Sequence, residues 1–230
     1  MENARLTGIS SMATRQVLAE LTAAWQQRSG AIVAIESVGG VDAAKRVQAG
    51  EVFDLVVLAS DAIERLLASG HVAAGSRIDL VRSDVAVAVR AGAARPDIGS
   101  EDALQRALLE ARSLAYSTGP SGVALARLFE RWGIADELCS RIVQPPPGVP
   151  IGTLVARGEV DLGFQQLSEL IHVQGIELLG PLPDSVRITT TFSGGVCTAS
   201  TKPEAARAVL EFMASPDAAE AKRRQGMAPA

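Results

Sequence analysis

Several kinds of residue and segment are scarce in this 230-residue sequence, and each scarcity narrows the range of functions. Aromatic residues make up 3%, which argues against surfaces that stack nucleic-acid bases or sugar rings. The net charge is −4 and no block of basic residues occurs, so we expect no nucleic-acid partner. No apolar run reaches the roughly 18 residues that suggest a membrane-spanning helix, so we expect no membrane insertion.

Cysteine and histidine are also rare, which limits the available catalysis and metal binding. Cys139 and Cys197 lie far apart and match no zinc-binding spacing, so we expect two unused thiols, with one disulfide left open. His71 and His172 lie near expected helix ends and are interpreted as surface residues. No Ser-His-Asp or Cys-His arrangement and no dinucleotide- or phosphate-binding loop is recognisable. The sequence therefore predicts no metal site and no cofactor.

The beginning of the chain bears on its location and its partners. Residues 1–6 contain no positively charged segment followed by an apolar one, so no signal peptide is visible. As written, the chain is expected in the cytoplasm, and in the periplasm if a leader has been trimmed. A transporter partner is expected only if the protein is exported.

Strand-like and helix-like segments alternate almost throughout, which predicts an α/β protein with largely parallel sheets. The expected strands and extended segments cover residues 6–9, 32–37, 54–59, 80–89, 112–116, 141–143, 161–164 and 186–199. The expected helices cover residues 12–27, 42–48, 60–67, 100–110, 121–132, 151–156, 203–213 and 216–224, with a stiff proline-rich loop at 145–148.

The two long extended segments predict that the chain crosses twice between two lobes. Lobe I is expected to combine residues 1–80 with 195–230, and lobe II, residues 84–185, to be inserted into it. The crossovers are expected at about 80–84 and 185–195.

Two turns rich in serine, threonine and glycine each follow a strand and lead into a helix, at residues 8–14 and 116–123. The first N–H groups of a helix lack partners within it, and its dipole is positive at that end, so such turns suit a small anion. The alternative is that Ser10, Ser11 and Ser121 are ordinary helix caps. Because the pattern occurs twice, it favours one anion held between the two lobes.

Three carboxylates were considered as catalytic bases: Asp42, Asp54 and Asp161. Asp54 and Asp161 open strands and are expected to accept backbone hydrogen bonds. Asp42 stands at the start of a helix and is interpreted as its cap, as are Ser60 and Asp61 for the next helix. No catalytic residue is assigned.

The order of these elements resembles the type II periplasmic solute-binding proteins, and most closely the molybdate-binding branch. The resemblance rests on four segments in the same order along the chain, followed by a glycine near the end: Ile9–Ser11, Gln48–Val56, Arg157–Phe164, Leu210–Pro216 and Gly226. It implies a two-lobed fold with a ligand cleft between the lobes.

The sequence departs from the pattern of the molybdate branch at two points, and both departures favour a ligand other than a compact oxyanion. The second loop, Gly39–Gly40, lacks the hydroxyl that the molybdate branch uses, and Gln165–Gln166 stands where that branch has a tyrosine. Glutamine offers both donors and acceptors, which favours a planar polycarboxylate over molybdate. Arg15, one turn into the first helix, could pair with a ligand carboxylate. The residues assigned to the ligand are Ser10, Ser11, Arg15, Gly39, Gly40, Ser121, Gly122, Gln165 and Gln166.

Two functions follow, and the sequence leaves both open. The first is binding of a small anion, a polycarboxylate or an oxyanion of the molybdate type, as in a solute-binding protein. The second is a cytoplasmic cis–trans or allylic isomerase of an unsaturated polycarboxylate, because the same lineage resembles aconitate isomerases. Such an enzyme removes and returns one proton while helix N-termini and hydroxyls hold the developing charge.

Overall fold

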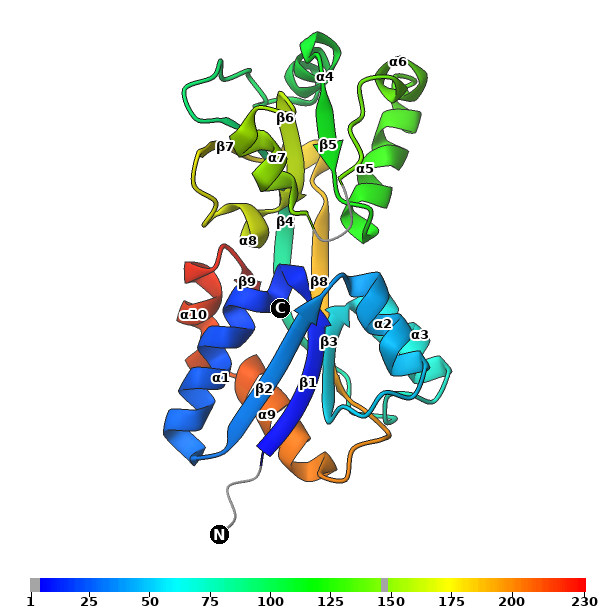
Figure 1. The fold of residues 1–230 in the computed structure, drawn as a ribbon, viewed down its shortest axis with the longest axis vertical. Helices are drawn as coiled ribbons and strands as arrows, with labels where there is room; N and C mark the ends of the chain where they lie inside the picture. Colours follow the sequence, from blue (N-terminus) through cyan, green and yellow to red (C-terminus); the bar gives the residue numbers. More distant parts are fainter. Residues whose placement is uncertain (1–4, 146–148) are drawn as a thin grey trace. The chain divides into compact units, whose positions relative to one another are not determined.

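The computed structural model describes residues 5–145 and 149–230. The chain divides into two compact units (Figure 1): unit 1 contains the residues up to Ser83 and those from Thr190 onward, and unit 2 contains Asp84–Thr189. The chain thus leaves unit 1 once and returns once. Of the expected proline-rich loop at 145–148, only Pro145 belongs to the described residues.

The sheet of unit 1 is mixed, with a parallel half and an antiparallel half. Its strands follow the order β2 (Ile32–Val38), β1 (Arg5–Ser11), β3 (Leu55–Ala59), β8 (Thr189–Val196) and β4 (Ile78–Arg90), and β9 (Ala228–Pro229) pairs with β4. β1 runs parallel to β2 and β3, whereas β8 is antiparallel to β3 and β9 to β4. The expectation of largely parallel sheets is therefore correct in unit 1 for β1, β2 and β3 but wrong for β8 and β9.

Helices cover both faces of this sheet, and the strand β3 at its centre is buried along its whole length. They are η1 (Met12–Thr14), α1 (Arg15–Ser29), α2 (Gly40–Gln48), α3 (Ser60–Ala68), α9 (Pro203–Ala214), η3 (Pro216–Ala218) and α10 (Ala219–Arg224). Along β3, Leu55 and Val57 pack with α1 and α9, whereas Val56 and Leu58 pack with α2 and α3 (Figure 1). Successive side chains of a strand point to opposite faces of the sheet, so each face of β3 packs against its own set of helices.

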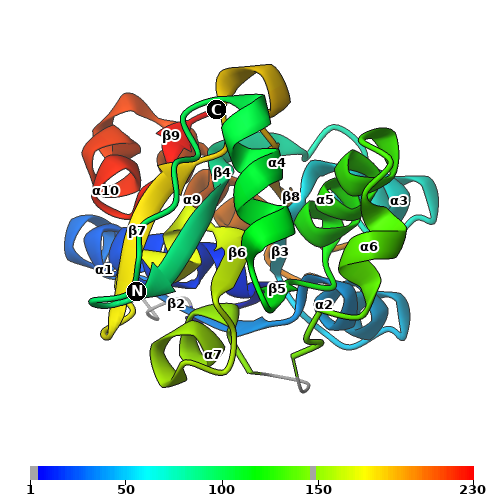
Figure 2. The same ribbon diagram turned by 90° about the horizontal axis from the view of Figure 1, so that it is seen from above.

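Unit 2 repeats this layered arrangement on a smaller sheet. β6 (Leu162–Gln166) lies between β5 (Leu114–Tyr116) and the second half of β4, and β7 (Ile176–Pro181) pairs with β4 on its other side. β4 is antiparallel to both β6 and β7, so in unit 2 the expectation of largely parallel sheets is correct for β5 and β6 alone. Its helices are α4 (Glu101–Glu110), α5 (Pro120–Arg131), α6 (Ala135–Cys139), α7 (Ile151–Arg157), α8 (Leu167–Leu170) and η2 (Asp184–Val186). α4, α5 and α6 share one core, and α7 and α8 share the core on the opposite face (Figure 2).

The α/β fold class is confirmed, and the element predictions needed several local corrections. The segment expected as a strand at 141–143 contributes only an isolated bridge between Ile142 and Leu114. The short elements α6, α8, β7 and β9 were not predicted, because segments of two to six residues carry too little periodicity to be recognised. β6 extends through Gln165 and Gln166, two residues beyond its expected end.

Candidate functional site

In unit 1, the carboxyl ends of three parallel strands meet at one edge of the sheet. Ser11, the last residue of β1, is paired with Val38 at the end of β2, and Ser10 is paired with Val57 near the end of β3. A helix begins directly after each strand. Open α/β sheets bind ligands at this edge, where unpaired helix N–H groups point outward.

Ser11 and the start of α2 come together at this edge. The Ser11 hydroxyl is the cap of η1 and accepts a 3.4 Å hydrogen bond from the Ala13 N–H. A Cβ on Gly40 would lie 3.5 Å from Ser11 Oγ, so the glycine turn brings the backbone of α2 close to this hydroxyl. Gly39 precedes α2 and provides no side-chain cap, which leaves the first N–H groups of α2 without a partner from the capping residue.

Ser10 has a different environment. Its side chain is fully buried, and its hydroxyl lies 2.8 Å from the hydroxyl of Ser37. The two predicted serines therefore have separate tasks: Ser10 joins β1 to β2, and Ser11 faces the helix starts.

The residues expected as helix caps in unit 1 do not cap. Asp42 lies inside the first turn of α2, with its carboxylate beside Gly39, and makes no capping hydrogen bond. α3 begins at Ser60 itself, after Ala59, with no side-chain cap. α2 begins two residues before Asp42, and α3 begins at Ser60, one of the two residues expected to cap it. Arg15 is exposed at the beginning of α1 and has no ion pair within the described part of the chain.

In unit 2, the second turn folds back tightly on the helix that follows it. The hydroxyl of Ser121, in the first turn of α5, lies 3.0 Å from the hydroxyl of Ser117, in the turn between β5 and α5. Gly119 is the capping position, so Ser121 stands in the first turn of α5 rather than at its cap, contrary to the capping prediction. A Cβ on Gly122 would lie only 1.5 Å from the carbonyl oxygen of Ser117, so this position accepts glycine alone.

The parallel pairing of β5 with β6 brings the glutamines to the same edge as this turn. Tyr116, at the end of β5, is paired with Phe164, so Gln165 and Gln166 continue beside the residues that follow Tyr116. Both glutamines are buried. Strand pairing thus groups Ser121, Gly122 and the two glutamines in one part of unit 2.

Gln165 holds a carboxyl group that sequence reasoning missed. Its amide nitrogen donates a 2.9 Å hydrogen bond to Glu169 in α8, and its amide oxygen is buried with no hydrogen-bond partner among the described residues. Burial raises the pKa of Glu169 to about 7, against the lowering effect of the Gln165 hydrogen bond. The only sequence signal was a glutamate four residues after Gln165.

The other polar candidates have structural roles. The Asp54 carboxylate accepts a 2.8 Å hydrogen bond from the Thr7 N–H, and Asp161 accepts one of 3.0 Å from the Arg112 N–H, as predicted. Ser193, on β8, is buried and donates to Asp79 at 2.6 Å.

The rare residues also have assigned environments. Both cysteines are free, Cys139 being exposed and Cys197 buried. His172 is exposed, whereas His71 is partly buried and lies 2.9 Å from the Ser69 hydroxyl through Nδ1. Within residues 5–145 and 149–230, no group of three or more metal-binding side chains occurs.

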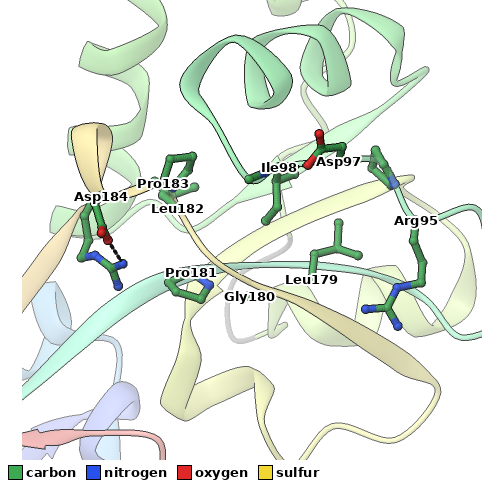
Figure 3. A pocket seen from close by; sticks show the side chains of 12 residues that line it. Arg95, Asp97, Ile98, Leu179, Gly180, Pro181, Leu182, Pro183 and Asp184 are labelled. Atoms are coloured by element: carbon green, nitrogen blue, oxygen red, sulfur yellow. Dashed lines mark hydrogen bonds and ion pairs between the residues drawn. The ribbon is translucent and has the colours of Figure 1, made fainter.

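A cavity of about 500 Å³ lies elsewhere in unit 2, between the loop before α4 and the segment after β7 (Figure 3). Its two arginines are already paired: Arg95 with Glu177 at 2.9 Å, and Arg187 with Asp84 at 2.8 Å and with Asp184. None of the sequence-predicted ligand residues lines it. Both of its cations are thus paired with carboxylates, and Asp97 adds a further carboxylate to its lining, so the cavity does not suit an anion.

Comparison with known proteins agrees with this architecture. The sequence family described as bacterial extracellular solute-binding protein matches residues 6–228. A Pseudomonas sp protein named aconitate isomerase is 41% identical over 230 residues, covering 97% of this chain and 87% of that protein. Within the described residues, no helix is long and apolar enough to cross a membrane.

Solved structures have the same fold at much lower identity. The periplasmic molybdate-binding protein of Azotobacter vinelandii superposes with a TM-score of 0.81 at 20% identity, covering 96% of this chain and 98% of that one. The sulfate-binding protein SubI of Mycobacterium tuberculosis has a TM-score of 0.78 at 18% identity, with 98% and 87% covered. These similarities confirm the type II periplasmic-binding fold that the order of segments predicted.

Proposed function

This chain belongs to the bacterial extracellular solute-binding protein family, and we propose that it uses this fold as an isomerase of a small unsaturated polycarboxylate. The observation that carries the proposal is the 41% identity, over nearly the whole chain, to a protein named aconitate isomerase. This identity favours a ligand of the same class as aconitate over the molybdate and sulfate for which the remote structural neighbours are named.

The chemistry of the two edges supports a carboxylate ligand. In unit 1, the Ser11 hydroxyl and the N–H groups at the start of α2 are neutral donors, and Arg15 is an exposed cation nearby in the sequence. In unit 2, the turn before α5 and Gln165 supply hydroxyl and amide groups. Neutral donors at helix N-termini hold carboxylates without requiring a full countercharge.

The proposed reaction shifts one proton and one double bond. A base removes a proton from the methylene group beside the double bond, and the C–H electron pair spreads over three carbons and the adjoining carboxylates. A proton then bonds to the far carbon of this allylic anion, and the double bond closes in the new position. The orientation of the substituents on the allylic anion when the double bond re-forms determines whether the product is cis or trans. No oxidant, reductant or net proton is consumed.

A passive anion binder is the second candidate, because the family and its solved relatives include proteins named for binding molybdate and sulfate. Proton exchange separates the two functions. The protein is incubated with trans-aconitate in D₂O and followed by proton NMR. An isomerase produces cis-aconitate and incorporates deuterium, whereas a binder leaves the trans isomer unchanged.

A thermal-shift series identifies the ligand independently of turnover. Molybdate, tungstate, sulfate, phosphate, citrate and the two aconitates are compared. A ligand present at 100 times its dissociation constant stabilises the fold by about 2.7 kcal/mol. Stabilisation by molybdate alone, with no turnover of aconitate, would contradict the proposed isomerase.

A further inference from the structure

The junction between β6 and α8 places a carboxyl group at the edge of unit 2 that carries the serine–glycine turn. β6 ends at Gln166, α8 begins at Leu167, and Glu169 lies one turn further on. β5 is parallel to β6 and ends beside it, and α5 starts at the same end of unit 2 (Figure 1). Glu169 is therefore next to an anion-binding feature although its own charge would repel an anion.

The Gln165–Glu169 pair is incomplete as a purely structural contact. Gln165 is 5% exposed, and its amide oxygen has no hydrogen-bond partner among the described residues. A buried polar atom that is left unpaired destabilises the fold, and a purely structural pair would avoid this cost. A buried amide oxygen without a partner, beside a carboxyl group that accepts a hydrogen bond from the same amide, is typical of a site completed by a ligand or used in proton transfer.

Burial disfavours the charged form of Glu169, and no cationic side chain is among the causes that shift its pKa. β6, against which α8 packs, contains no titratable residue, and the titratable residue of α7, which shares a core with α8, is the exposed Arg157, paired with Glu159 at 3.7 Å. Glu169 is the one titratable residue of α8. The nearest titratable group along the chain is the exposed His172. Desolvation raises the pKa of Glu169 to about 7, and the Gln165 hydrogen bond acts in the opposite direction. A carboxyl group in this range both accepts and returns a proton near neutral pH.

We propose that Glu169 is the acid–base residue that carries the proton between the two ends of the substrate's allylic system, with Gln165 as its positioning residue. This assignment rests on the proposed isomerase function. The ionised carboxylate takes the methylene proton and forms an O–H bond while the C–H electron pair enters the allylic anion. The acid exchanges its proton with water, and its O–H bond then breaks as a proton bonds to the far carbon, which regenerates the carboxylate.

Gln165 suits this cycle because an amide can partner both states of the carboxyl group. Its N–H donates to the carboxylate, as in the 2.9 Å contact, and its oxygen can accept from the carboxylic acid after a rotation of the amide. One residue thus holds Glu169 in place before and after the proton has moved. Substrate carboxylates remain with the helix starts.

The experiment compares wild type with Glu169→Gln, which keeps the shape and loses the ability to exchange a proton. We expect turnover of trans-aconitate and deuterium incorporation to fall by about 10²- to 10⁴-fold. The dissociation constant for tricarballylate, a saturated analogue that cannot react, should stay within about threefold or tighten. Glu130→Gln is the matched control, because Glu130 is an exposed glutamate of unit 2 and should retain full activity.

Gln165→Met gives a second measurement that does not depend on the stability of the first variant. The methionine removes the hydrogen bond that lowers the pKa of Glu169, so the acidic limb of the kcat–pH profile should shift to higher pH than in wild type. A merely structural role for Gln165 would lower activity equally at every pH.

The outcomes distinguish a wrong assignment of Glu169 from a wrong assignment of the isomerase function. If wild type isomerises aconitate and Glu169→Gln does so equally well, the residue assignment is wrong and the isomerase function stands. An unshifted pH profile in Gln165→Met would also contradict the assignment. If wild type binds tricarballylate but converts no trans-aconitate into cis-aconitate, the isomerase function itself fails, and the role of Glu169 fails with it.

Discussion

The carbonyl oxygen of Ser117 occupies the space that a side chain at Gly122 would need, because a Cβ there would lie 1.5 Å away. The turn after β5 therefore wraps onto the first turn of α5 only because residue 122 is glycine. Gly122→Ala should push the two segments apart, destabilise the fold by about 1–3 kcal/mol and weaken binding of tricarballylate. Chemical denaturation and calorimetry measure the two effects.

Gly119→Ala is the matched control for this change. A Cβ on Gly119 would lie 3.9 Å from the Ser117 hydroxyl, which is an ordinary contact, and the backbone there is extended. This variant should fold with near wild-type stability. Equal stability of the Gly119 and Gly122 variants would show that the turn tolerates the displacement.

The serines of the two turns are expected to bind the ligand as well as support the helices. Ser11→Ala and Ser121→Ala should each remove a charge-assisted hydrogen bond worth about 1.5–3 kcal/mol, or about ten- to a hundredfold in affinity. Calorimetric titration with tricarballylate measures this loss. The comparison is Ser100→Ala, which removes the cap of α4, where Ser100 Oγ accepts from the Ala103 N–H at 3.2 Å.

The control separates the two roles because a cap contributes to folding alone. Ser100→Ala should cost about 1 kcal/mol of stability and leave ligand affinity unchanged. If Ser11→Ala and Ser121→Ala behave in the same way, with lower melting temperatures only, the anion-binding role of both turns is excluded. The prediction that one anion uses both turns requires both variants to lose affinity for the same ligand.

Asp42 should weaken anion binding at the start of α2. Its carboxylate lies in the first turn of that helix, beside Gly39, where it adds a negative charge next to the proposed ligand donors. Asp42→Asn removes this charge and should tighten tricarballylate binding by about 0.3–1 kcal/mol at low salt. Asp102→Asn, in the first turn of α4, is the control and should leave affinity unaltered. Weaker binding by the Asp42 variant would place the ligand away from α2.

Much of the fold was predictable because long amphipathic segments carry a clear period. α1, α4 and α9 were predicted within a few residues of their bounds, and Leu55–Ala59 was recognised as a buried strand from its apolar run. The direction of β8 and β4 was not predictable, because a strand's own residues do not determine whether its neighbour runs parallel.

The site was predictable to the extent that it consists of helix starts. Gly122 was found because glycine and serine before an apolar periodic segment indicate a turn into a helix, and Gly39 and Gly40 were assigned through the resemblance to the molybdate-binding branch. Glu169 was missed because its importance comes from burial and from Gln165, one helical turn earlier. The sequence alone shows a glutamate, and only packing raises its pKa.

Glu169 should also make stability depend on pH, and this effect can be measured without substrate. Burial raises its pKa from about 4.5 to about 7, so between these values the folded protein holds a proton that the unfolded chain has lost. Stability therefore falls as pH rises through this window and stays lower above it, by about 3 kcal/mol in total.

Glu169→Gln carries no ionisable group and should escape this loss. In urea denaturation, the variant should exceed wild type by up to about 3 kcal/mol at pH 8, with the difference shrinking toward pH 4.5. Glu130→Gln should show no such trend, since Glu130 is exposed in the folded protein. A Glu169 variant that gains no stability at pH 8 would mean that the carboxyl group is well solvated, and would remove the physical basis for its use as a base near neutral pH.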